Sequence, residues 1–159
     1  MADSPVQFRD LLYVVAAFGL IYLLFSQLIE SPAPQVMVSA SGSEVVIQAD
    51  RSGHFRGDGE INGAPVHFLV DTGASYLSIP KTMAQALGLS RGQTVKLQTA
   101  AGEVEGYRTM VESVRFTVLE QHNVAAVVIP QLKQPLLGMN FLRQLSITQR
   151  KGEMVLRVE

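Results

Sequence analysis

The sequence predicts a mostly β domain of antiparallel strands, preceded by one transmembrane helix. Three observations support this fold class: an uncharged apolar run over residues 11–29, short strand patterns from residue 44 onward, and turn dipeptides between them. The 159 residues, of which 47% are apolar and 17% charged, suit one globular domain plus one unusually hydrophobic segment. A second folded domain is therefore not expected.

The apolar run reads LLYVVAAFGLIYLLFSQLI over residues 11–29. At about 1.5 Å per residue it would span roughly 28 Å, the thickness of a bilayer's hydrocarbon core. A cleaved signal peptide has a shorter apolar stretch of about 7 to 15 residues, which favours an uncleaved anchor and leaves secretion after cleavage as the alternative. Arg9 precedes the run and the next basic residue is Arg51, so we expect the domain to face away from the cytoplasm.

The chain thus divides into a cytoplasmic tail (1–10), a transmembrane helix (11–29), an extended tether (30–43) and a folded domain (44–159). The tether is assigned from its Pro, Ser, Gly and Ala content. Within the domain, strands are predicted at 44–48, 53–61, 66–70, 76–79, 94–99, 104–119, 124–129, 146–149 and 154–158. Asn62-Gly63 and Lys151-Gly152 are typical hairpin turns.

Two short helices interrupt the strands. Pro80 can open a helix over residues 81–87, which Gly88 ends, and Asn140 can open a second over residues 141–145. The domain is therefore all-β except for these two pieces.

Composition excludes several classes of function. The 13 basic and 14 acidic residues are dispersed, so no nucleic-acid partner is expected. The absence of cysteine removes disulfides, thiolate metal sites and thiol nucleophiles. The three histidines, His54, His67 and His122, lie far apart in sequence and show no metal-ligand spacing, so neither a metal nor a cofactor is predicted.

The catalytic chemistry is predicted at Asp71, where an apolar strand ends in the sequence Asp-Thr-Gly. A carboxylate in such a place is costly because it is partly removed from water, so its presence indicates a function. Gly73 permits a tight turn and the close approach of another chain. By itself the tripeptide is also compatible with an ordinary turn.

The longer context is more specific. FLVDTGAS at residues 68–75, followed far downstream by Leu136-Leu137-Gly138, resembles the two signatures of pepsin-like and retroviral-type aspartic proteases. The likeness covers residues 53–158 and is strongest to the membrane-anchored, single-lobe retropepsin-like proteases of bacteria.

The resemblance implies a single-lobe acid protease barrel that acts as an aspartic endopeptidase on protein or peptide substrates. Because this chain has one Asp-Thr-Gly, it implies a homodimer in which each protomer supplies one catalytic aspartate. It also implies a single-pass protein of the bacterial inner membrane with its C-terminal domain in the periplasm. The residues carried over are Asp71, Thr72 and Gly73 for catalysis; Ala74, Ser75, Thr99, Ala100, Ala101 and Gly102 for substrate binding, the last four as a flap; and Leu136, Leu137 and Gly138 as the structural second signature.

Two positions depart from the retroviral pattern. Ser75 and Met139 stand where those enzymes have an acidic residue and an arginine that form an ion pair near the dimer contact. We therefore expect a weak dimer, with the last two strands leaving a sheet edge that needs a partner.

Other interpretations remain open. Asp58 and Glu60 form a second possible carboxylate pair, but alternate residues of a strand share a face and are commonly solvated. A fold does not fix a function, so a non-catalytic module that binds or scaffolds peptides is the alternative to a protease.

Overall fold

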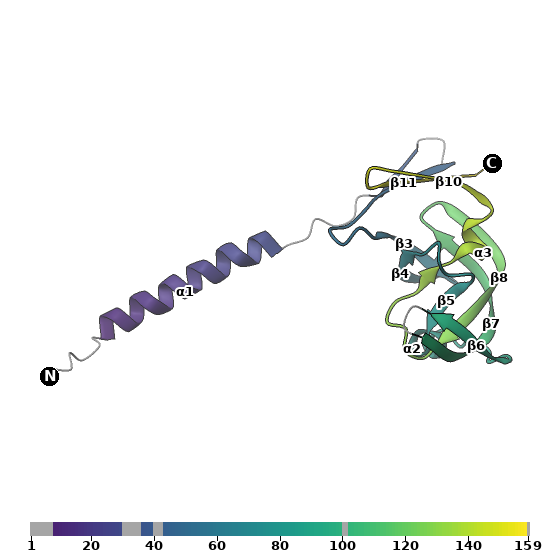
Figure 1. Cartoon of the computed structure of the whole chain (residues 1–159), viewed down its shortest axis with the longest axis horizontal. Helices are drawn as coiled ribbons and strands as arrows, with labels where there is room; N and C mark the ends of the chain where they lie inside the picture. The colour runs from purple at the N-terminus through teal and green to yellow at the C-terminus, as the bar shows by residue number, and fades with distance from the viewer. Residues whose placement is uncertain (1–7, 30–35, 40–42, 100–101, 159) are drawn as a thin grey trace. The chain divides into compact units, whose positions relative to one another are not determined.

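The computed structural model describes residues 8–29, 36–39, 43–99 and 102–158. The chain divides into two compact units, Met1–Ala33 and Pro34–Glu159, each described here by itself. The first unit contains a single helix, and the second is built almost entirely of strands (Figure 1).

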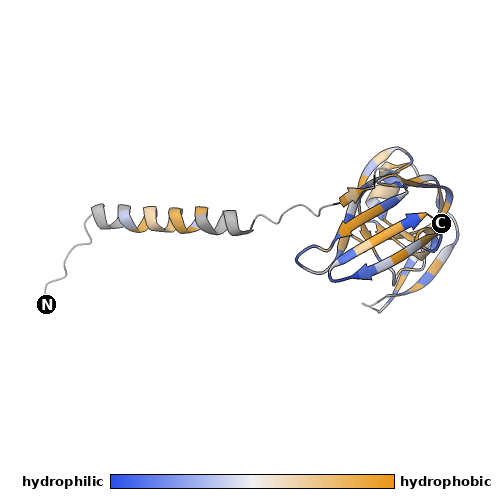
Figure 2. Ribbon diagram, turned by 90° about the horizontal axis from the view of Figure 1, so that it is seen from above, coloured by the Kyte–Doolittle hydropathy of each residue, from blue (hydrophilic) through white to orange (hydrophobic). Residues whose placement is uncertain are grey.

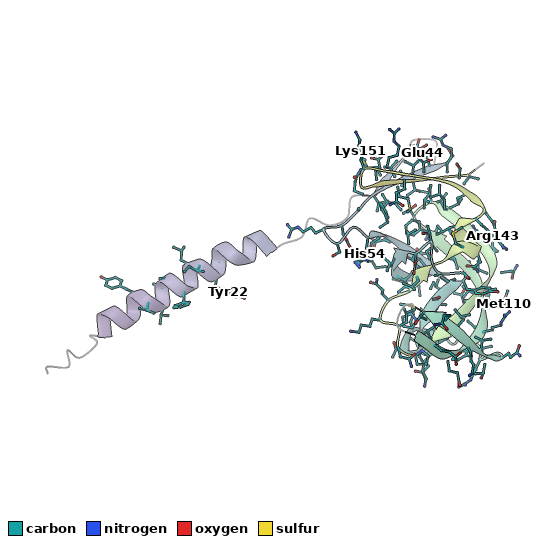
Figure 3. The ribbon with its side chains drawn as sticks, viewed as in Figure 1. Tyr22, Glu44, His54, Met110, Arg143 and Lys151 are labelled. Carbon is teal, nitrogen blue, oxygen red and sulfur yellow. The ribbon has the colours of Figure 1, made fainter. Side chains whose placement is uncertain are left out.

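The helix α1 (Phe8–Ile29) covers the predicted apolar run. Large apolar side chains are exposed on all of its sides between residues 13 and 23, among them Phe18. Figure 3 labels another of them, Tyr22. Within the described part of the chain, no helix combines the length and hydropathy needed to cross a membrane. The transmembrane prediction for residues 11–29 is therefore not confirmed.

Seven strands of the second unit form a sheet that closes into a barrel. Their order is β3 (Phe55–Ile61), β4 (Ala64–Val70), β9 (Leu136–Leu137), β5 (Leu77–Pro80), β8 (Leu119–Ile129), β7 (Gly102–Phe116) and β6 (Thr94–Thr99). Because β3 also pairs with β7, the sheet has no free edge between these two strands. Fully buried Phe68 and Phe116 meet edge to face inside it, with ring centroids 6.1 Å apart.

A second, antiparallel sheet has the order β1 (Val36–Val38), β2 (Glu44–Gln48), β11 (Glu153–Val158), β10 (Leu145–Arg150). Alternate residues of β2 and β11 are buried. Figure 2 shows hydrophobic and hydrophilic bands alternating along strands of this unit. The predicted turns are confirmed: Asn62, Gly63, Lys151 and Gly152 all have the positive φ that two-residue hairpin turns require.

The last two strands were expected to leave a free sheet edge, and only one of them, β10, does so. The strand β11 pairs with β2 on one side and β10 on the other, so only β10 and β1 lie at an edge. The strand β1 itself falls inside the predicted tether, where three residues pair with β2. The tether prediction is wrong for these residues, because pairing with a distant strand outweighs their local composition; residues 30–35 and 40–42 lie outside the described part.

The first predicted helix is confirmed as α2 (Lys81–Ala86), followed by Gly88 at φ +62°. The second is displaced: α3 spans Met139–Leu142 and begins after Gly138, so Asn140 lies inside the helix rather than before it. Leu145, predicted to be helical, instead starts β10 because it pairs with Val158.

Candidate active site

Asp71 lies at the end of β4, where the chain leaves the barrel wall and turns. Its backbone N–H donates to the carbonyl of Leu137 at 3.1 Å, which continues the parallel pairing of β4 with β9. The N–H of Gly73 donates to Oδ1 of Asp71 at 2.9 Å, and the N–H of Ala74 donates to the Asp71 carbonyl at 3.2 Å. The carboxylate is therefore half-buried and held in one orientation by its own turn.

Gly138 packs against the backbone of this turn. A Cβ atom at Gly138 would lie 2.3 Å from the carbonyl oxygen of Tyr76 and 2.9 Å from that of Ala74. The φ of Gly138 is −90°, so glycine is needed here for the close approach of two backbones and not for an unusual conformation. The Leu-Leu-Gly segment thus passes directly beside the Asp-Thr-Gly turn.

Asn140 ties the same turn to the barrel, a role that the sequence reasoning missed. Its Oδ1 accepts a hydrogen bond from the N–H of Leu77 at 2.7 Å, and its Nδ2 donates to the carbonyl of Ala125 at 2.6 Å. One amide side chain therefore joins β5, β8 and α3. The available signal was a polar residue immediately before the apolar pair Phe141-Leu142.

The Asp71 carboxylate faces a cleft of about 550 Å³. The cleft is lined by Asp71, Gly73, Ala74, Ser75, Tyr76, Ser78, Lys96, Leu97, Gln98, Thr99, Val127, Ile129 and Leu136. Six of the predicted site residues therefore line the cleft: Asp71, Gly73, Ala74 and Ser75 from the turn, Thr99 from the flap, and Leu136. Apart from Thr99, the residues contributed by β5, β6 and β8 were not predicted, because only the pairing of distant strands places them here.

Asp71 is the single carboxylate among the described residues that line the cleft. The one lysine, Lys96, forms an ion pair with Glu103 on the neighbouring strand at 2.9 Å. A reaction that needs two carboxyl groups must therefore obtain the second from another chain.

The hairpin of β6 and β7 stands where the flap is predicted. Thr99 and Gly102 are paired across it, and Oγ1 of Thr99 donates to the carbonyl of Gly102 at 2.7 Å. Gly102 has a φ of +106°, a conformation that favours glycine. Ala100 and Ala101, the predicted tip, lie outside the described residues, and Thr72 is exposed beside the cleft.

The alternative carboxylate pair lies on the outer surface of the barrel and does not line the cleft. Asp58 binds Nδ1 of His67 at 2.7 Å, and Glu60 forms an ion pair with Arg115. This contact lowers the pKa of Glu60 and raises that of Arg115, because each charge stabilises the other. Both carboxylates therefore take part in strand-to-strand contacts, and no group of three metal-ligating side chains is found among the described residues.

A sequence profile of the family described as gag-polyprotein putative aspartyl protease matches residues 57–144, more than half of the chain. The chain belongs to this retropepsin-like family. The match includes β4, the Asp71 turn and the Leu-Leu-Gly segment, and it confirms the family indicated by these motifs.

Two curated bacterial proteins are similar in sequence to this retropepsin-like chain. It is 32% identical over 140 residues to an uncharacterized protein in the cobV 5' region of a Sinorhizobium species, and 28% identical over 127 residues to an uncharacterized protein of Rickettsia prowazekii. These matches cover 84% and 78% of this chain, but only 60% and 55% of the two relatives. The chain thus spans little more than half the length of the curated relatives that it matches.

Among solved structures, the retropepsin-like fold matches the crystal structure of a retropepsin-like aspartic protease from Rickettsia conorii. The TM-score is 0.62 at 29% identity, and the match covers 80% of this chain and 96% of the other. The predicted retropepsin-like barrel is therefore confirmed.

The two departures from the retroviral pattern lie together in this retropepsin-like domain. Ser75 and Met139 line one surface hollow of about 510 Å³ beside the Asp71 turn. Backbone hydrogen bonds join their segments: the N–H of Met139 donates to the carbonyl of Ala74 at 2.7 Å, and that of Asn140 to the carbonyl of Ser75 at 3.1 Å. Backbone contacts thus connect the two segments that an ion pair joins in retroviral enzymes.

Proposed function

We propose that this protein is a homodimeric aspartic endopeptidase. It hydrolyses peptide bonds with a water molecule activated by two Asp71 carboxyl groups, one from each protomer. The observation that carries the proposal is the fixed carboxylate of Asp71 at a cleft whose described lining holds no second acid. Single-lobe retropepsin-like proteins work as dimers, which supports this arrangement.

The proposed reaction divides two tasks between the two carboxyl groups. One Asp71 is ionised and the other keeps a proton, because two adjacent carboxylates do not both ionise readily. The ionised group removes a proton from water as the water oxygen bonds to the peptide carbonyl carbon, and the protonated group donates its proton to the carbonyl oxygen. The group that took the proton from water then donates it to the nitrogen as the C–N bond breaks, and the other group takes a proton from one hydroxyl of the intermediate, which restores the carboxyl pair.

Three features support a twofold contact at this place. Thr72 and Gly73 are exposed in the single protomer, so the partner's matching turn can approach them. The edge strand β10 presents backbone groups that a second chain can pair with. Since Ser75 and Met139 cannot form the retroviral ion pair, we expect the dimer to be weak.

The function is tested by cleavage of a peptide library with the purified full-length chain. Wild type, at a concentration at which sedimentation shows it to be dimeric, is then mixed with increasing amounts of the Asp71→Asn variant and allowed to exchange subunits. If mixed dimers are inactive, activity per wild-type chain should fall to about half in an equal mixture and to about one tenth at ninefold excess. An unchanged activity per wild-type chain would contradict the shared site. Failure to cleave any library member, with binding retained, would favour a non-catalytic module.

We also propose that residues 11–29 anchor the protein in a bacterial inner membrane, with the domain in the periplasm. The uncharged run and the apolar side chains exposed on all sides of α1 support this. Replacing Gly19 and Leu20 by arginine should move the protein into the soluble fraction or block export, since each charge near a helix centre costs roughly 2.5–3.5 kcal/mol on insertion.

Mass spectrometry of the cellular protein checks the secreted alternative. A mature chain that begins near Ser41 would show that the helix is removed, and an extractable wild-type protein with an intact N-terminus would contradict an anchor.

A further inference from the structure

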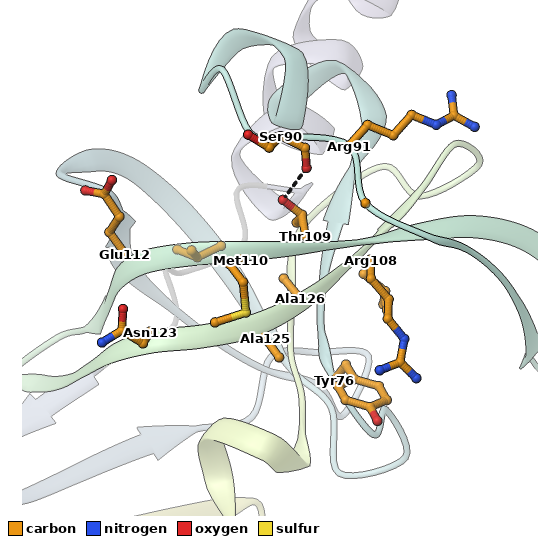
Figure 4. A pocket seen from close by; sticks show the side chains of 13 residues that line it. Tyr76, Ser90, Arg91, Arg108, Thr109, Met110, Glu112, Asn123, Ala125 and Ala126 are labelled. Carbon is orange, nitrogen blue, oxygen red and sulfur yellow. Dashed lines mark hydrogen bonds between the residues drawn. The ribbon is translucent and has the colours of Figure 1, made fainter.

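A second hollow, here called the lateral groove, lies on the outer face of β7 and β8. It has a volume of about 560 Å³ and is lined by residues 90–92, 108–112 and 125–127, with Tyr76 and Asn123 (Figure 4). Nothing in the proposed reaction uses this groove. Its residues were also not among those predicted from the sequence.

One wall of the lateral groove is fixed to β7 by three hydrogen bonds. The N–H of Gly92 donates to the carbonyl of Arg108, and the N–H of Arg108 donates to the carbonyl of Gln93, each at 2.9 Å. The buried Oγ1 of Thr109 donates to the carbonyl of Ser90 at 2.7 Å, the contact that is dashed in Figure 4. The segment that forms this wall is therefore held against the barrel by hydrogen bonds.

The middle of the lateral groove is apolar. Met110 is 57% exposed and points away from the barrel (Figure 3). It is paired across the two strands with Ala125, whose side chain is also exposed. Exposed apolar side chains at adjacent positions on two strands form a surface that an apolar side chain of another molecule can cover.

The two ends of the lateral groove carry opposite charge. The Arg108 guanidinium lies 5.7 Å from the Tyr76 ring centre, and that of Arg91 lies 4.9 Å from the Tyr107 ring centre. Neither arginine belongs to an ion pair found among the described residues. Glu112 lies at the opposite end from Tyr76 (Figure 4). A ligand should therefore place its negative charge near Arg108 and keep it away from Glu112.

The lateral groove adjoins the cleft at Asp71. Tyr76 and Val127 line both, and Arg108 lies over the Tyr76 ring, so a peptide chain that leaves the cleft over Tyr76 would meet the basic end of the groove. Because a homodimer has two such grooves related by the twofold axis, either end of a bound peptide would meet one of them.

We propose that the lateral groove binds the segment of a protein substrate that flanks the cleaved part. It selects an acidic residue on the side of the cleft and an apolar residue two positions further from the cleft. This inference rests on the proposed function. In an extended chain, residues two apart share a face and lie about 6.8 Å apart, as Arg108 and Met110 do on β7. Such a segment would place its carboxylate at Arg108 and its apolar side chain on Met110 and Ala125.

The test compares extended versions of one core peptide that the wild-type protein cleaves. The core is joined at its C-terminus, through a short glycine spacer, to Asp-Ser-Leu, to Asn-Ser-Leu or to the reversed Leu-Ser-Asp. The first should be cleaved with a kcat/KM roughly fivefold above the other two, and this advantage should shrink at about 0.5 M salt because exposed charges are screened.

Reversing the charge of Arg108 tests the proposal more directly. In the Arg108→Glu variant, a Lys-Ser-Leu extension should become preferred over Asp-Ser-Leu. The matched control, Lys81→Glu, makes the same change of charge at an exposed residue of α2 outside the groove and should keep the wild-type order. Each comparison is a ratio within one variant, so an effect of Arg108 on Tyr76 that alters all peptides equally cancels.

Binding to the Asp71→Asn protein, measured by fluorescence anisotropy with the same peptides, separates the two proposals. Equal cleavage and equal binding of the three extensions would overturn the groove assignment and leave the protease intact. If wild type cleaves nothing, the proposed function fails, and the binding order alone then decides the groove assignment: the same preference supports it, and its absence overturns it.

Discussion

Replacing Asp71 by asparagine is expected to lower peptide cleavage by at least about 10³-fold, because the dimer would lose both the group that activates water and the group that protonates the substrate. The fold should remain, since the amide oxygen of asparagine can accept the hydrogen bond that the N–H of Gly73 donates to Oδ1 of Asp71. The measurement is kcat/KM on a library-derived peptide, with circular dichroism to monitor the fold.

Asp58→Asn is the matched control for this substitution. Asp58 is also an aspartate on the barrel, but its side chain is 93% exposed and contacts His67 outside the cleft. This variant should keep wild-type activity. Substantial cleavage by a folded, purified Asp71→Asn protein would show that the assigned carboxylate is wrong.

Replacing Gly138 by alanine should both destabilise the domain and remove activity. The added Cβ would lie 2.3 Å from the carbonyl oxygen and 2.5 Å from the carbonyl carbon of Tyr76, both backbone atoms that cannot rotate away. Relief requires the Asp71 turn and β9 to separate, at a cost of about 1–3 kcal/mol. Urea denaturation measures the free energy of unfolding, and peptide cleavage measures the integrity of the site.

Gly152→Ala serves as the comparison for Gly138→Ala. Gly152 has a φ of +79° and open space around it, so alanine there meets only the conformational cost of about 1–2 kcal/mol. That variant should lose some stability and keep its site. If Gly138→Ala is as stable and as active as wild type, the segment around Gly138 does not lie as close to the Asp71 turn as described.

Local sequence patterns predicted most of the barrel. The bounds of β2 and β6 agree with prediction, because alternation of buried and exposed residues and flanking turn residues both operate within a few positions. The turn between β7 and β8 was missed: it contains Thr117 at φ +56° and Val118, and β-branched residues are not typical of such turns. The strand predicted as 104–119 therefore ends at Phe116, and β8 begins at Leu119 rather than at Val124.

Non-local contacts account for what could not be predicted. The strand β9 has two residues and no alternation of its own; it exists because it pairs with β4 and β5. The Asp71 turn carried a readable motif, whereas residues such as Ser78 and Ile129 reach the cleft only through strand order. The lateral groove had no motif at all, since its charge and apolar pattern arises from side chains on two paired strands and a loop.

The placement of β9 also sets the order in which the site can assemble during synthesis. The Asp71 turn is made early in translation, but its supports, the Leu137 carbonyl and the side chain of Asn140, belong to the last part of the chain. Pairings between residues so distant in sequence form late, because the long intervening loop must first be closed. A nascent chain therefore carries an unsupported Asp71 turn until nearly all of the domain has been made, which delays any proteolytic activity until the barrel is complete.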